Sequence, residues 1–92
     1  MPPRFRIFIT LLLLSLCALQ AKSDATRIDF YYGIAEGNYL IGDLKGAANN
    51  VEQMLKLDAD YVPALTLKTR IKIDQGEPQV ALESADHAIS LE

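Results

Sequence analysis

The sequence predicts an all-α fold of tandem antiparallel helical hairpins, with four helices preceded by a hydrophobic N-terminal signal helix. The first observation is a self-match at a period of 34 residues, because Gly76 follows Gly42 and Ala81 follows Ala47 at that offset. The second is the helical spacing of apolar residues between these glycines. A period of this length, marked by helix-ending glycines and small residues, is typical of an array of helix-turn-helix repeats.

The first 21 residues have the organisation of a signal peptide. Arg4 and Arg6 precede an uncharged stretch of thirteen residues, Ile7 to Leu19. Thirteen helical residues rise about 20 Å, which is less than the roughly 30 Å of hydrocarbon that a spanning helix must cross. We therefore expect cleavage after Ala21 and export of the rest of the chain. Retention as a signal anchor and lipidation at Cys17 are the alternatives.

The charge and cysteine content exclude several classes of function for the remaining chain. Arg4 and Arg6 are two of the nine basic residues and all twelve acids come later, so the chain from Lys22 onward carries a formal charge of −5. Its basic residues are few and scattered, whereas nucleic-acid binding needs a basic stripe. Cys17 is the only cysteine. The body therefore has no thiol for catalysis, for zinc or for an iron–sulfur cluster.

The first helix of the body is expected over residues 28–41, after an exposed linker at 22–27. Three linker residues are able to cap it, namely Ser23, Asp24 and Thr26. Its apolar positions at helical spacing, which predict one buried stripe, are Tyr31, Ile34, Ala35 and Ile41. Gly33 and Gly37 lie four residues apart, and we expect them to permit close approach of a neighbouring helix.

The second helix is expected over residues 44–57, directly after a tight turn. Gly42 stands where a left-handed residue ends the preceding helix, and Asp43 is placed to cap the next one. The residues expected to face the first helix recur at intervals of three or four: Leu44, Ala47, Ala48, Val51 and Leu55.

The third and fourth helices repeat this arrangement. Residues 62–75 form the third helix, with Asp60 as its expected cap and Pro63 in its first turn, and Gly76 ends it. Pro78 opens the fourth helix, which runs to Leu91. Its small and branched face consists of Ala81, Leu82, Ala85, Ala88 and Ile89.

This pattern resembles the tetratricopeptide repeat, a 34-residue pair of antiparallel helices, over residues 28–92. In the first repeat, 28–61, the resemblance rests on Tyr31, Ile34, Ala35, Gly42, Asp43, Ala47, Leu55, Leu57 and Asp58. In the second, 62–92, it rests on Leu65, Gly76, Ala81, Ala88, Ile89 and Leu91. The departures from the family pattern are Asn38, Ala59, Lys68, Thr69 and Lys72. Of the matched residues, those expected to hold the hairpins together are Ala35, Gly42, Ala47, Leu55, Gly76, Ala81 and Ala88.

The resemblance also implies where a partner would bind. In that family the first helix of each repeat lines a concave groove. The residues placed there by the resemblance are Asp29, Tyr32, Glu36, Tyr39 and Leu40, followed by Thr66, Arg70, Ile73 and Asp74. Tyr32 and Glu36 occupy positions where carboxylate-gripping members have asparagine or lysine, so a clamp for a C-terminal carboxylate is not expected.

No residue pattern favours catalysis, a cofactor or a metal. His87 is the sole histidine, with Glu83 one turn before it and Asp86 beside it, which is typical of a solvated helix face. Asp58 and Asp60 lie in a turn between helices, where capping explains them. Ser84 and Ser90 have no histidine at triad spacing. We therefore expect a protein that is not an enzyme.

The leading hypothesis is an exported scaffold or adaptor, in a bacterial periplasm or cell envelope, that binds a peptide segment or another subunit in its groove. Secretion or membrane anchoring is the alternative location. The alternative function is a truncated or half-array structural module that self-associates or stacks on another repeat protein, because the fourth helix leaves an apolar face uncovered.

The expected mature protein begins at Lys22. Mass spectrometry and N-terminal sequencing of the exported protein should give this residue, because the small side chain of Ala21 suits the cut. A mass that includes residues 1–21 would instead establish a signal anchor. A lipid-modified first residue at Cys17 would establish a lipoprotein.

Overall fold

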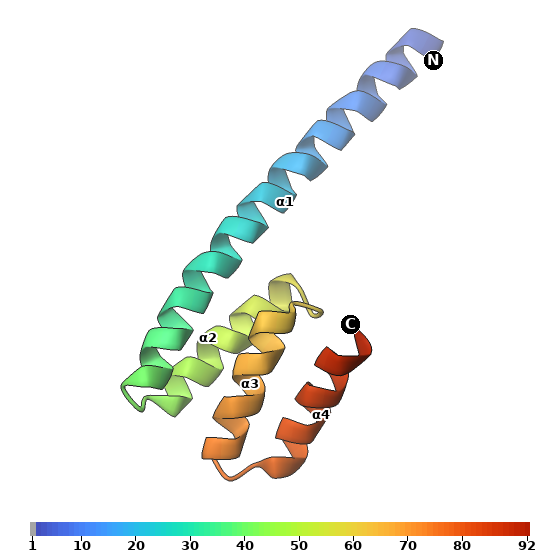
Figure 1. Cartoon of the computed structure of the whole chain (residues 1–92). Helices are drawn as coiled ribbons and strands as arrows, with labels where there is room; N and C mark the ends of the chain where they lie inside the picture. Colours follow the sequence, from blue (N-terminus) through green and yellow to red (C-terminus); the bar gives the residue numbers. More distant parts are fainter. Residues whose placement is uncertain (1) are drawn as a thin grey trace.

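The computed structural model describes residues 2–92, and these form four helices with no strand among them. The helices are α1 (Pro3–Leu40), α2 (Leu44–Leu57), α3 (Val62–Asp74) and α4 (Pro78–Ser90). α1 packs on α2, α2 on α3 and α3 on α4. Figure 1 shows α2, α3 and α4 gathered beside the C-terminal part of α1, while its N-terminal part extends away alone. The all-α prediction is confirmed.

The linker predicted at 22–27 is helical, and α1 runs through it without a break. Two of its three candidate cap residues bond inside the helix: the Thr26 hydroxyl donates to the Lys22 carbonyl at 3.1 Å, and the Asp24 carboxylate accepts from the Gln20 amide at 3.1 Å. The prediction that one of them caps a helix starting at Ile28 is therefore wrong. The signal helix and the first helix of the body form one element of 38 residues.

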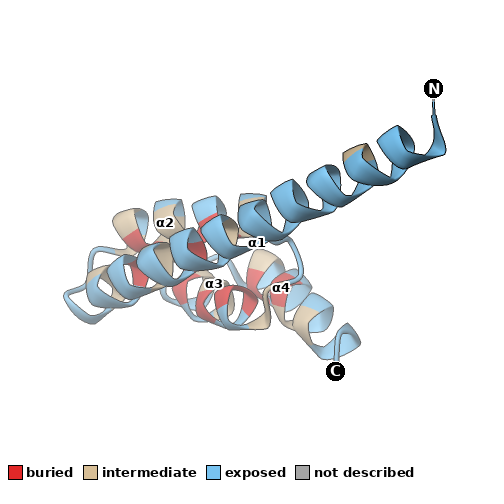
Figure 2. Ribbon diagram, turned by 90° about the horizontal axis from the view of Figure 1, so that it is seen from above, coloured by how far each residue is buried: buried red, intermediate tan, exposed pale blue. Residues whose placement is uncertain are grey.

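The N-terminal part of α1 makes no core. Figure 2 shows this part exposed almost throughout, in contrast to the buried surfaces where α1, α2 and α3 meet. By length and composition α1 is able to cross a membrane, although the thirteen uncharged residues 7–19 alone are too short; an N-terminal signal sequence shares this property.

Both hairpins end their first helix with the same turn. Gly42 and Gly76 have φ values of 83° and 77°, in the left-handed region that glycine enters without steric cost. In each turn the N–H of the next residue bonds to the carbonyl five residues back, at 2.8 Å in both cases. This is the Schellman pattern, which satisfies carbonyls left free at a helix end. The glycine signals in the sequence therefore marked both turns correctly.

The two aspartates expected to cap helices behave differently. The Asp43 carboxylate accepts from the Gly46 N–H at 2.9 Å and caps α2 as predicted. A Cβ at position 46 would collide with that carboxylate, so glycine is what lets the cap close. Asp60 does not cap α3, whose N-cap residue is Tyr61 without a side-chain bond. The Asp60 carboxylate pairs with His87 instead.

The core lies where α1, α2 and α3 meet. Its buried members are Ile28, Ala35, Ala47, Val51, Met54, Ala64, Leu67 and Ile71, and half-buried Leu55 packs against them. In the second hairpin Ala81 is buried and Ala88 is half-buried. The 34-residue offset predicts small residues at the helix crossings, and Ala47 and Ala81 are both buried.

The buried stripe of α1 differs from the predicted one. Ala35 is fully buried and Tyr31 half-buried, but Ile34 and Ile41 are exposed. Gly33 and Gly37 share this open side, since a Cβ on either would meet nothing within 4 Å. The expectation that these two glycines admit a neighbouring helix within the chain is therefore wrong. α1 carries two apolar faces, and only one is covered.

Two glycine replacements should shift stability in opposite directions. Gly42→Ala should lower the free energy of unfolding by about 1–2 kcal/mol, because alanine is strained at positive φ. Gly37→Ala should raise it by up to about 1 kcal/mol, because Gly37 lies inside a helix with open space around it. Urea unfolding of the dilute chain in mild detergent, followed by circular dichroism, measures both. Equal effects of the two replacements would contradict this account of the turn.

Candidate functional site

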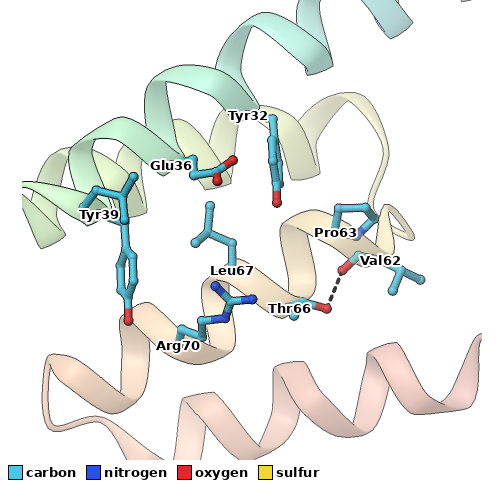
Figure 3. A pocket seen from close by; sticks show the side chains of 9 residues that line it. Tyr32, Glu36, Tyr39, Val62, Pro63, Thr66, Leu67 and Arg70 are labelled. Atoms are coloured by element: carbon cyan, nitrogen blue, oxygen red, sulfur yellow. Dashed lines mark hydrogen bonds between the residues drawn. The ribbon is translucent and has the colours of Figure 1, made fainter.

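A hollow of about 260 Å³ lies between α1 and α3. Its lining comes from the C-terminal part of α1 and the first turns of α3, as Figure 3 shows: Tyr32, Glu36, Tyr39, Leu40, Val62, Pro63, Thr66, Leu67 and Arg70. Figure 3 shows Tyr32, Glu36 and Tyr39 on the side of α1 that faces α3, with Arg70 extending toward them. The Thr66 hydroxyl donates to the Val62 carbonyl of its own helix at 2.9 Å.

Most of the residues placed in a groove by the sequence meet here. Tyr32, Glu36 and Tyr39 are three or four residues apart, so they share one face of α1. Thr66 and Arg70 are related in the same way on α3. Because α1 and α3 are consecutive first helices of the two hairpins, these two faces lie opposite each other. Leu40 lines the hollow too.

Three residues predicted in the groove lie outside the hollow. Asp29 lies near the α2–α3 connection. Burial of the Tyr61 hydroxyl is the main cause that raises its pKa, and the negative charge of Asp29 raises it further. Ile73 lines a different hollow, between α3 and α4. Asp74 bonds to Tyr39 at the edge of the site. The hollow therefore gathers the middle of the helical face assigned from the sequence and leaves out its ends.

Sequence reasoning missed three lining residues, Val62, Pro63 and Leu67. Pro63 is expected from the sequence only as a residue suited to the first turn of α3. A signal did exist, since Pro63 lies three residues before the predicted Thr66 and Leu67 lies three residues before the predicted Arg70. The start of α3 thus supplies apolar surface to the site.

The hydroxyl of Tyr39 joins the two helices at one end of the hollow. It donates to the Asp74 carboxylate at 2.7 Å, and the pair is exposed to solvent. This hydrogen bond is the main cause that raises the pKa of Tyr39 above 10, and Arg70 opposes it with its positive charge. The neutral hydroxyl is therefore the form that ties the end of α1 to the end of α3.

The hollow offers mixed chemistry. The aromatic rings of Tyr32 and Tyr39 provide rigid contact area, and tyrosine combines an apolar ring with a polar tip. Glu36 and Arg70 bring opposite charges from opposite helices. Such a lining is able to contact apolar groups, accept an N–H and pair with a carboxylate.

The other polar residues considered in the sequence are linked to the fold. The His87 Nε2 lies 2.9 Å from the Asp60 carboxylate, so the α2–α3 connection is tied to α4 by an exposed pair. The Asp58 carboxylate accepts from the Asp60 N–H at 3.0 Å and closes the turn. Ser84 is buried, and the Ser90 hydroxyl donates to the His87 carbonyl. Within residues 2–92 no three His, Cys, Asp or Glu side chains gather to hold a metal ion.

Comparison of this chain with models of protein families, with curated protein sequences and with solved structures gives no match. The resemblance to the tetratricopeptide repeat therefore stays a prediction. What the structure provides is the arrangement of helices and the position of each side chain named above.

Replacing Asp74 with asparagine should lower the pKa of Tyr39 toward 10. The replacement removes the carboxylate that holds the phenolic proton. A raised folded-state pKa gives stability that is present below pH 10 and is lost as the pH rises through the folded value, so Asp74→Asn should flatten the fall in stability on the alkaline side. Ultraviolet titration of the phenolates, with Tyr39→Phe to assign the signal, measures it.

Asp86→Asn is the matched control, because Asp86 is not among the groups that shift either tyrosine. An unchanged titration in Asp74→Asn would show that the bond between Tyr39 and Asp74 does not form in solution.

Proposed function

We propose that this chain is an exported interaction module that holds a peptide segment of a protein partner in the hollow between α1 and α3. The observation that carries this proposal is the lining of that hollow by Tyr32, Tyr39, Glu36 and Arg70, which face one another from two helices. Tyrosine and arginine are the residues that most often dominate binding energy at protein interfaces. The resemblance to the tetratricopeptide repeat supports the same function.

The shape of the hollow favours a short extended segment over a folded surface. A volume of about 260 Å³ takes one or two side chains rather than a domain face. Glu36 and Arg70 stand on opposite walls, so a bound segment with a basic and an acidic side chain would find a partner on each. The apolar surface of Val62, Pro63 and Leu67 would accept an aliphatic side chain between them.

The N-terminal half of α1 supports export. Its apolar stretch follows two arginines and lies at the chain terminus, as in a signal sequence or a membrane anchor. We propose a bacterial periplasm or cell envelope as the location, with the body on the outer side of the membrane because the positive end stays inside. Cleavage would release the module, and retention would hold it at the membrane.

A second function is favoured by a specific observation. Ile73, Leu82 and Ile89 are large apolar side chains that stay exposed on α3 and α4. Exposed apolar patches of this kind mark sites of association. We therefore also propose that the body completes its core by contact with another chain.

Peptide selection tests the first function. A displayed library of random peptides, selected on the full chain in detergent micelles, should enrich binders whose dissociation constant rises at least tenfold on Tyr39→Ala or Arg70→Ala. Loss of a central aromatic or arginine contact commonly has an effect of this size, about 1.4 kcal/mol per tenfold. Fluorescence anisotropy measures the affinities, and circular dichroism verifies that each variant keeps its helices.

Asn49→Ala is the control, since Asn49 is exposed on α2 and does not line the hollow. Peptides that bind Tyr39→Ala and Arg70→Ala as tightly as the unchanged chain would place the binding surface elsewhere.

A further inference from the structure

The stack of helices has an uncovered apolar face at each end. The head face lies on α1 and its C-cap residue, and it consists of Phe30, Gly33, Ile34, Gly37 and Ile41. Phe30 is 63% exposed and Ile41 80%, and neither glycine has a neighbour within 4 Å of where its Cβ would be. The tail face lies on α3 and α4 and consists of Thr69, Ile73, Leu82, Ala85, Ala88 and Ile89. Leu82 is 57% exposed and Ile89 67%.

The head face is the counterpart of a surface that is buried inside the chain. Moving 34 residues along the sequence takes Phe30 to Ala64, Gly33 to Leu67 and Gly37 to Ile71. These three α3 residues are buried, because α1 and α2 cover them. The head face therefore has the position in the first hairpin that the packed face of α3 has in the second.

The tail face is the counterpart of the surface that covers α3. The same offset takes Val51 to Ala85, Met54 to Ala88 and Leu55 to Ile89. Val51 and Met54 are fully buried against α3 and Leu55 packs at their edge. The interface between α3 and the first hairpin has two sides. The head face corresponds to one side and the tail face to the other, and both are uncovered in a single chain.

We propose that the head face of one copy of this chain docks on the tail face of a second copy and continues the stack of hairpins. The occupant is a second copy because the joint extends an interface that the chain already makes within itself, between α3 and the first hairpin. This inference rests on the second proposed function and gives it a partner and a geometry. The contact is heterologous, so each copy keeps one free end and further copies are able to add.

The side-chain volumes at the two faces are complementary. On the tail face Ala85 and Ala88 replace the larger Val51 and Met54, and the hollow between α3 and α4 at this place has a volume of about 260 Å³. On the head face Phe30 replaces the smaller Ala64. Since an apolar cavity of about 150 Å³ already accommodates benzene, the hollow has room for the ring of Phe30.

The charges agree with the same arrangement. Within one copy, Glu36 of α1 faces Arg70 of α3 across the hollow. The 34-residue offset takes Glu36 to Arg70. At a joint between copies, Arg70 of one copy would therefore face Glu36 of the next. Opposite charges meet at every step of the stack, which favours this register over one with like charges opposed.

The joint is also compatible with the N-terminal extension of α1. The chain reverses direction in α2 and again in α3, so α1 and α3 run in the same direction, side by side in the stack, as Figure 1 shows. A second copy that places its α1 beside α3 and α4 would have its own extension on the same side. All extensions of such an assembly are thus free to enter one membrane.

The experiment blocks one face at a time. Ile34→Glu charges the head face and Ile89→Glu charges the tail face. Both positions are open to solvent in the single chain, at 38% and 67% exposure. The full chain is purified in a large excess of detergent micelles, and its protein mass is measured by light scattering over a concentration series. We expect the unchanged chain to grow in mass with concentration and each variant alone to remain monomeric.

The mixture of the two variants is decisive. Ile34→Glu keeps a working tail and Ile89→Glu keeps a working head, so an equimolar mixture should form a 1:1 dimer that does not extend. Phe30→Ala, added to the Ile89→Glu variant whose head face docks, should raise the dissociation constant of this dimer at least tenfold. Asn49→Glu adds the same charge on the exposed side of α2 and should associate like the unchanged chain.

Three outcomes would overturn the inference, and they have different meanings. If the unchanged chain stays monomeric at every concentration, the second proposed function fails with it. If Ile34→Glu alone still forms dimers, the tail faces pair with each other and only the head-to-tail geometry fails. If the variants are folded by circular dichroism but their mixture stays monomeric while the unchanged chain associates, the contact uses neither face as described.

Discussion

The packing of α3 against the first hairpin is the constraint on which the rest of the structure depends. Leu67 and Ile71 are buried against a surface built by Ala47, Val51 and Met54. Small side chains at the crossing allow the helices to approach, and the larger ones beside them fill the space. This contact sets the distance between α1 and α3 and thereby creates the hollow that holds Tyr32 and Arg70.

The elements of the fold could be predicted where local chemistry decides them. Gly42 and Gly76 mark both turns because glycine is the residue that adopts positive φ without strain, and the starts of α2 and α4 follow from them. The buried side of α1 could not be found in this way. Its residues 28–41 carry apolar side chains on two faces, and periodicity alone does not say whether Ile34 or Tyr31 faces inward. The covered face is decided by what α2 and α3 present.

The candidate site was predicted in its centre and missed at its edges for related reasons. Residues four apart, such as Tyr32 and Glu36, lie on the same face of a helix. Asp29 lies three residues before Tyr32 and Ile73 three residues after Arg70, so each is about one helical turn beyond the last residue that lines the hollow. The contact between Asp60 and His87 joins residues 27 apart in sequence, and no local pattern indicates it.

The continuous α1 helix has a mechanical consequence. At 1.5 Å per residue its 38 residues measure about 57 Å, close to the 61 Å long axis of the whole molecule. No glycine or proline interrupts it between Arg4 and Phe30. As long as residues 3–27 stay attached, turning the outer end of this rod about its own axis swings the tyrosine-lined hollow through the same angle. The apolar N-terminal segment and the hollow between α1 and α3 are therefore joined by one continuous helix, with no flexible segment between them.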